Sequence, residues 1–104
     1  MDLEEKLAAF FQVLGNPIRI KILNLFKRKK VMCVCELTEL LKREQSVVSR
    51  NLIALKQIGI LDCETKATRS FYRIKDETIY KIIELTTHIL EKRIKEEQKV
   101  LALI

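Results

Sequence analysis

Two cysteines one residue apart, Cys33 and Cys35, have the spacing most suited to chemistry in this 104-residue chain. They stand where an apolar helical pattern begins, and a helix N-terminus lowers the pKa of a nearby thiol. Soft thiolates suit As(III), Cd(II), Pb(II), Zn(II) or Cu(I) as ligands, although zinc sites use three or four protein ligands. The pair therefore predicts a soft-metal or metalloid site, and it leaves open a thiol-redox or persulfide switch and simple packing.

The chain holds three cysteines, an odd number that builds no even disulfide framework. The first residues, Met1–Glu5, are acidic where a signal peptide is basic, and the chain has no run of about 18 apolar residues that would span a membrane. We therefore expect a soluble cytoplasmic protein without membrane contact, whose cysteines are thiols rather than structural disulfides. Cys63 falls in a predicted strand, where we expect a half-buried side chain rather than a third metal ligand.

A second group of residues has the chemistry of nucleic-acid contact. A helix over about residues 45–58 is predicted by the helical spacing of Val48, Leu52 and Leu55. These apolar residues form its buried face, so the opposite face is polar. That face carries Gln45, Ser46, Ser49, Arg50 and, at its edge, Ile53. A guanidinium matches two acceptors on the major-groove edge of guanine, so Arg50 is predicted to read a base. Gln45 and Ser46 are predicted to contact phosphates near the helix N-terminus, with Ser46 as a plain N-cap the alternative.

A β-hairpin is predicted after this helix, over about residues 60–75. Aromatic and branched residues gather at 70–74, and the tip is expected near residues 66–69. Lys66, Thr68 and Arg69 would project from that tip beside phosphates or a minor groove, contacts that position a protein without specifying a sequence. Two short helices followed by a hairpin are typical of a winged helix-turn-helix, in which the second helix enters the major groove.

The composition supports one mainly helical domain over residues 1–104. Apolar residues make up 48% of the chain, with only two Gly and one Pro. The net charge is +6, and the positive charge is concentrated in two blocks, +6 over residues 19–30 and +5 over 42–75. Separated blocks of this kind predict one basic face and a polyanionic partner. No Ser/His/Asp set or Gly-rich phosphate loop is present, so we expect neither an enzyme nor a required cofactor.

The remaining elements follow from apolar periodicity. It predicts helices over about 3–14, from Pro17 to the basic cluster 27–30, over 34–41 and over 77–99. The expected fold is mainly α with a β-hairpin, in the order α-α-α-α-β-β-α. The apolar arc of the last helix is wider than one core face needs, which indicates a second partner.

Several motifs resemble the ArsR/SmtB family of metal-responsive winged-helix repressors, over about residues 5–95. Leu14–Leu23 is similar to the family signature at its first two helices, and Cys33-Val34-Cys35 to its metal box. Gln45–Leu52 is similar to its recognition helix, while 59–61 and 72–74 match the edges of its wing. The resemblance implies a homodimer formed by helices 3–14 and 77–99 and a pseudo-palindromic site on double-stranded DNA. It also implies release from DNA by an inducer or by thiol oxidation.

The chain departs from the family pattern at several places, among them the wing tip, which lacks the usual Gly. Asn51 stands where a His is usual, and we include Asn51 among the predicted DNA contacts. Thr38 occupies the place where arsenic-sensing members carry a third Cys. The single histidine, His88, is too few for the paired ligands that the family's other metal site uses on the last helix.

The sequence therefore predicts a dimeric, sequence-specific transcriptional repressor released by As(III), Cd(II), Pb(II) or Zn(II) at Cys33 and Cys35. An inducer there is expected to shift the adjacent helix or the dimer angle without blocking the DNA face. The alternatives are a thiol-redox or ligand-independent winged-helix regulator and a protein-interaction module that does not bind DNA.

Overall fold

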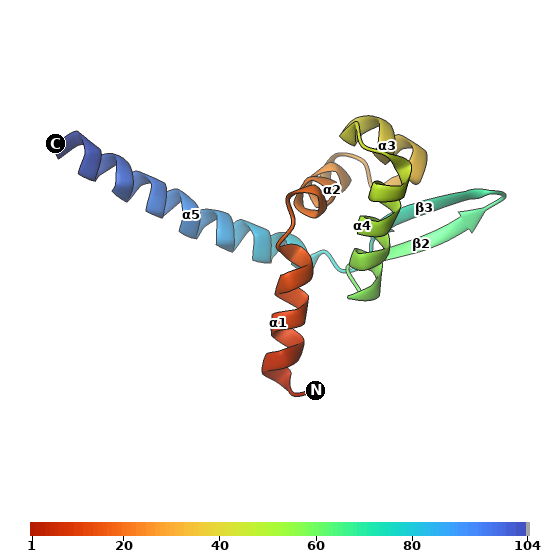
Figure 1. Cartoon of the computed structure of the whole chain (residues 1–104), viewed down its shortest axis with the longest axis horizontal. Helices are drawn as coiled ribbons and strands as arrows, with labels where there is room; N and C mark the ends of the chain where they lie inside the picture. The colour runs from red at the N-terminus through yellow and green to blue at the C-terminus, as the bar shows by residue number, and fades with distance from the viewer. Residues whose placement is uncertain (104) are drawn as a thin grey trace.

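The computed structural model describes residues 1–103 and contains five helices and three strands (Figure 1). The helices are α1 (Leu3–Leu14), α2 (Pro17–Arg28), α3 (Val34–Leu41), α4 (Gln45–Gln57) and α5 (Thr78–Leu103). The strands are β1 (Val31–Cys33), β2 (Leu61–Lys66) and β3 (Arg69–Ile74). The expected order of four helices, a hairpin and a last helix is confirmed, with β1 as an addition.

Strand β1 was missed because three residues are too few to show an alternating pattern. It pairs antiparallel with β3, so the sheet has the order β1-β3-β2. Met32 lies opposite Tyr72 and Cys33 opposite Phe71, and both Met32 and Cys33 are buried. The pairing holds the start of α3 against the hairpin of β2 and β3, so the cysteine pair lies beside that hairpin.

The core lies between α2, α3, α4 and the sheet. Its largest fully buried side chains include Phe26 of α2, Leu37 of α3 and Leu52 of α4. Local signals set the ends of these helices. The Asn16 side chain accepts from the first backbone amides of α2 and Pro17 begins that helix, while Gly59, at φ +83°, follows the end of α4.

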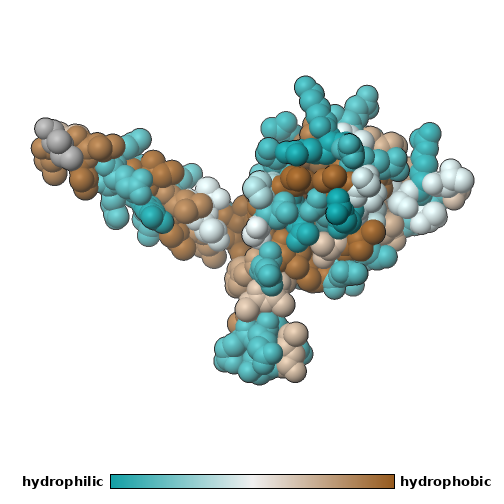
Figure 2. Space-filling model, in the orientation of Figure 1, coloured by the Kyte–Doolittle hydropathy of each residue, from teal (hydrophilic) through white to brown (hydrophobic). Residues whose placement is uncertain are grey.

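Helices α1 and α5 project from this core in different directions (Figure 1), and the molecule measures 61 × 37 × 22 Å. Apolar side chains line the exposed length of α5 in Figure 2. The exposed large apolar residues of the two helices are Leu3, Leu7, Phe11, Leu85, Ile89, Leu90, Ile94, Val100, Leu101 and Leu103. Helix α5 also runs past its predicted end near residue 99. Within residues 1–103, no helix is both long and apolar enough to cross a bilayer.

Candidate DNA-binding face and cysteine site

Helix α4 follows α3 after a short turn and presents a polar outer face. Lys42 ends α3 in the left-handed conformation, and α4 begins at Gln45. Its N-cap is Glu44, which makes no side-chain cap hydrogen bond, so the alternative of Ser46 as an N-cap is wrong. Val48, Leu52 and Leu55 are fully buried, as their spacing predicted. The opposite face bears Gln45, Ser46 and Arg50, all exposed, and Ser49, which is half-buried.

The hairpin tip is a two-residue turn, Ala67-Thr68, between the paired residues Lys66 and Arg69. Ala67 has φ +55°, a conformation in which an L side chain is strained and a Gly is not. Lys66, Thr68 and Arg69 are exposed at this tip, where the sequence placed them.

Asn51 lies in the interior rather than on the polar face. Only 7% of it is exposed, and both ends of its amide are hydrogen-bonded within the protein. Its Oδ1 accepts from Arg19 Nε at 2.8 Å, and its Nδ2 donates to the Val47 carbonyl at 2.9 Å. The spacing contained this signal, since position 51 is three residues after Val48 and falls on the buried stripe of α4. The structure therefore removes Asn51 from the predicted set of DNA contacts.

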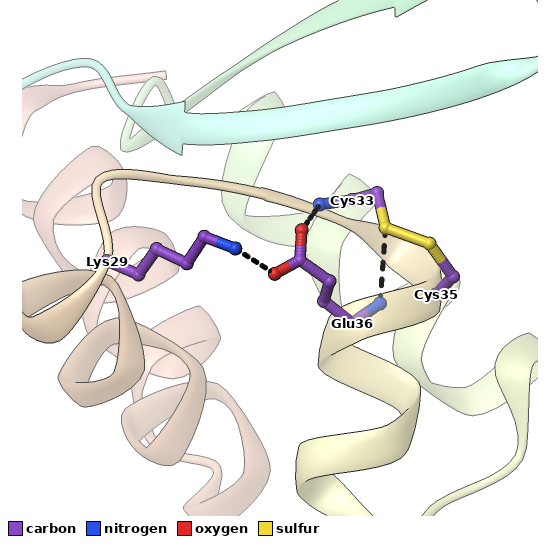
Figure 3. A network of polar contacts seen from close by, with 4 residues as sticks. All are labelled: Lys29, Cys33, Cys35 and Glu36. Carbon is purple, nitrogen blue, oxygen red and sulfur yellow. Dashed lines mark hydrogen bonds and ion pairs between the residues drawn. A yellow bond between two sulfur atoms is a disulfide. The ribbon is translucent and has the colours of Figure 1, made fainter.

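The cysteine pair forms a disulfide at the start of α3 (Figure 3). The expectation of free thiols at these two positions is wrong for this structure, because a one-residue separation at a helix start brings the Cα atoms to 5.2 Å. Cys33 is also the N-cap of α3: its Sγ accepts from the Glu36 backbone amide at 3.2 Å. Glu36 Oε1 accepts in turn from the Cys33 backbone amide at 3.3 Å, which completes a capping box.

Lys29 extends this network from the end of α2. Its ammonium pairs with the Glu36 carboxylate (Figure 3). The hydrogen bond from Lys29 and, to a lesser extent, that from Cys33 lower the pKa of Glu36 below its ordinary value, although some desolvation opposes them. The cap beneath the disulfide is therefore stabilised by a carboxylate that stays ionised.

One cavity joins the cysteine pair to the expected DNA-contacting residues. It has a volume of about 260 Å³. It is lined by Cys33 and Cys35, by Gln45 and Ser49 of α4, and by Thr68, Arg69 and Ser70 of the wing. An occupant of this cavity would touch α4 and the wing directly. The expectation that an inducer leaves the DNA face unblocked stays a prediction, and this cavity offers an alternative to it.

The other candidate ligands lie elsewhere. Cys63 is half-buried on β2, as expected, and pairs with Tyr72 across the sheet; burial, followed by the influence of Cys63, raises the pKa of Tyr72. His88 is exposed on α5. Within the part of the chain that the structure describes, no three His, Cys, Asp or Glu side chains form a metal-binding group.

Comparisons with known proteins decide the family. The model for the bacterial regulatory proteins of the arsR family matches residues 16–62. An uncharacterized HTH-type transcriptional regulator of Methanocaldococcus jannaschii is 36% identical over 89 residues, which cover 86% of this chain and all of the relative. The arsenical resistance operon repressor of Bacillus subtilis is 32% identical over 78 residues, which cover 75% and 74%.

The chain belongs to the ArsR family. The structure of a homodimeric winged helix-turn-helix DNA-binding domain from Mycobacterium bovis supports the fold, with a TM-score of 0.77 at 24% identity over 90% of this chain and 86% of that one. As an ArsR-family member, the protein is a DNA-binding transcriptional regulator and not an enzyme. Helix α4 and the hairpin of β2 and β3 lie where the sequence predicted the recognition helix and the wing.

Proposed function

We propose that this regulator is a dimeric repressor that binds a pseudo-palindromic operator through α4 and the wing. The observation that carries the proposal is the set of exposed or half-buried polar and basic side chains on the outer side of α4 and at the wing tip. They are Gln45, Ser46, Ser49 and Arg50 on α4, and Lys66, Thr68 and Arg69 at the wing tip. Arg50 reads a base, because a guanidinium can donate two hydrogen bonds to the major-groove edge of guanine. The other side chains contact phosphates or sugars, because the wing lies along the DNA backbone.

Exposed apolar surface on the projecting helices supports the dimer. Side chains such as Phe11 of α1 and Leu85 and Ile89 of α5 are 52%, 66% and 61% exposed. Apolar surface of this extent marks an interaction site. A two-fold dimer buries the same helices in both protomers and sets two α4 helices in successive major grooves, roughly 34 Å apart. The homodimeric relative in fold from M. bovis supports the same assembly.

The cysteine pair is the proposed control point. When reduced, Cys33 and Cys35 supply two thiolates to a soft ion such as As(III), with further ligands from solvent or a small thiol. The B. subtilis relative, an arsenical resistance operon repressor, supports this chemistry. The disulfide favours a second candidate, a thiol-redox switch, because both sulfurs are withdrawn from metal binding when they are bonded to each other.

The test is fluorescence anisotropy with labelled DNA from upstream of the protein's own gene, at one stated salt concentration. Wild type and a Cys33→Ser/Cys35→Ser variant are titrated under reducing conditions, with and without As(III), Cd(II), Pb(II) and Zn(II). Release of the wild type alone by one of these ions establishes a thiolate sensor. Release on oxidation alone establishes the redox switch.

The contrary result is equally specific. Phosphate-driven binding weakens as salt rises, so absence of DNA binding even at low salt contradicts the repressor proposal and favours a protein-interaction module. Sedimentation of the protein without DNA tests the dimer separately.

A further inference from the structure

The cavity at the cysteine pair has a chemical character of its own. None of its lining residues is acidic, and three of them, Ser49, Thr68 and Ser70, carry hydroxyls. The Gln45 amide and the Arg69 guanidinium complete the polar lining. Neutral donors beside one cationic side chain suit a small anion, and a guanidinium matches a carboxylate with two parallel hydrogen bonds.

The two sulfurs are not equivalent. Cys33 is 3% exposed, whereas Cys35 is exposed, so a molecule in the cavity reaches the Cys35 sulfur. The Cys33 sulfur accepts a hydrogen bond from the Glu36 backbone amide at the positive end of α3. That position stabilises a Cys33 thiolate and makes it the better leaving group when the disulfide is attacked.

We propose that this cavity binds a small organic thiol bearing a carboxylate, and that the thiol forms a mixed disulfide with Cys35. The thiolate of the ligand attacks Cys35 Sγ, a bond forms between these two sulfurs, and the Cys33–Cys35 bond breaks. Cys33 leaves with the electron pair as a thiolate, so one disulfide replaces another without an added oxidant. Arg69 and the hydroxyls hold the carboxylate.

The regulatory consequence rests on the proposed function. Gln45, Ser49, Thr68 and Arg69 belong both to the cavity and to the proposed DNA-contacting set. A carboxylate among them neutralises Arg69 and fills the space between α4 and the wing, where a phosphate would otherwise be bound. The ligand therefore displaces DNA by occupying its contacts, with no change in the dimer angle required.

The first experiment measures the chemistry without DNA. Oxidised protein carrying Cys63→Ser is mixed with mercaptoacetate, neutral 2-mercaptoethanol or cationic cysteamine, quenched in acid, and analysed by intact-mass and peptide mass spectrometry. We expect the adduct on Cys35. We expect the rate ratio of mercaptoacetate to 2-mercaptoethanol to fall about two- to fivefold in Arg69→Gln, the size of one exposed charge pair. The intrinsic reactivity of each thiol is the same with every protein variant, so it cancels when this rate ratio is compared between variants.

Arg73→Gln is the matched control, since Arg73 is an exposed arginine on the same strand that does not line this cavity. Its rate ratio should equal that of the parent. An adduct on Cys33, or a charge preference unaffected by Arg69→Gln, overturns the proposal.

The second experiment measures DNA binding of a stable adduct. In a Cys33→Ser/Cys63→Ser variant, Cys35 is modified with the symmetrical disulfide of mercaptoacetate, and no neighbouring thiol can remove the adduct. Serine is a good N-cap, so α3 keeps its start. We expect operator affinity to fall at least tenfold relative to the same variant unmodified; unchanged affinity overturns the shared-site inference. If the unmodified protein binds no DNA, the proposed function fails while the mass-spectrometric result still decides the ligand site.

Discussion

Replacing Asn51 with Ala removes a buried link between three helices. Arg19 of α2 donates through Nε to Asn51 Oδ1 at 2.8 Å and through Nη1 to the Val13 carbonyl of α1 at 3.0 Å. Asn51 also donates to the Val47 carbonyl within α4. One side chain thus connects α4 to Arg19, which itself contacts the end of α1.

The expected cost follows from these contacts. A hydrogen bond to a charged group contributes about 1.5–3 kcal/mol. Arg19 is half-buried, so water replaces part of the lost bond and the hydrogen-bond cost stays near the lower limit. The small cavity left by the amide adds to it. We expect Asn51→Ala to lower the free energy of unfolding by about 2–3 kcal/mol.

Urea unfolding at a fixed protein concentration measures this difference, because stability of a dimer depends on concentration. Asn24→Ala is the matched control, an exposed asparagine on α2 whose replacement should change stability by less than about 0.5 kcal/mol. Asn51→Asp keeps an acceptor for Arg19 but loses the donor to Val47. Its unfolding free energy should lie between those of the Asn51→Ala and Asn24→Ala variants. Equal stability of the Asn51→Ala and Asn24→Ala variants would refute the account of Asn51 as a buried link.

Four further predictions concern the DNA face, the wing and the cap. Arg50→Ala should cost roughly 1–3 kcal/mol of operator binding and flatten preference at one base pair, whereas Lys66→Ala should weaken specific and random DNA alike; anisotropy on both DNAs tells them apart. Ala67→Gly should raise unfolding free energy by about 0.5–1 kcal/mol by relieving the positive φ, as urea titration would show. The pKa of Glu36 is lowered in the folded protein, so ionised Glu36 contributes to folding stability above its ordinary pKa, and this contribution is lost as the pH falls through the lowered value. The difference in unfolding free energy between wild type and Glu36→Gln should therefore narrow below about pH 4.5. A difference that stays constant with pH would contradict the pairing of Glu36 with Lys29. Saturating operator DNA should slow modification of Cys35 but not of Cys63, which mass spectrometry can follow.

Local patterns were sufficient for most of the fold. The burial of Val48, Leu52 and Leu55 follows from helical spacing alone, and the break at Gly59 from its conformational freedom. Asn51 shows where residue type misled the interpretation. Its polarity suggested the DNA face, while its position on the α4 stripe assigned it to the interior. A half-buried partner 32 residues away, Arg19, makes that position compatible with a polar side chain.

Long-range contacts account for what the sequence did not show. The pairing of β1 with β3 joins residues about 40 positions apart, and no local pattern announces it. That pairing sets Cys33 opposite Phe71, close to the wing tip. The sequence without this pairing shows Cys33 and Cys35 only as a pair at the start of a helix, and it does not show which residues surround them.

The same contact changes how the cysteine site can act on DNA binding. A sensor remote from DNA needs a two-state element to carry its signal, such as a shift of the dimer angle. Here the capping box holds the start of α3, β1 holds it against β3, and the cavity brings Cys35 to Arg69 and Ser49. A ligand on Cys35 therefore acts on residues it touches. The strength of the proposed switch then depends on how many of the proposed DNA contacts the ligand occupies, and not on how far a helix moves.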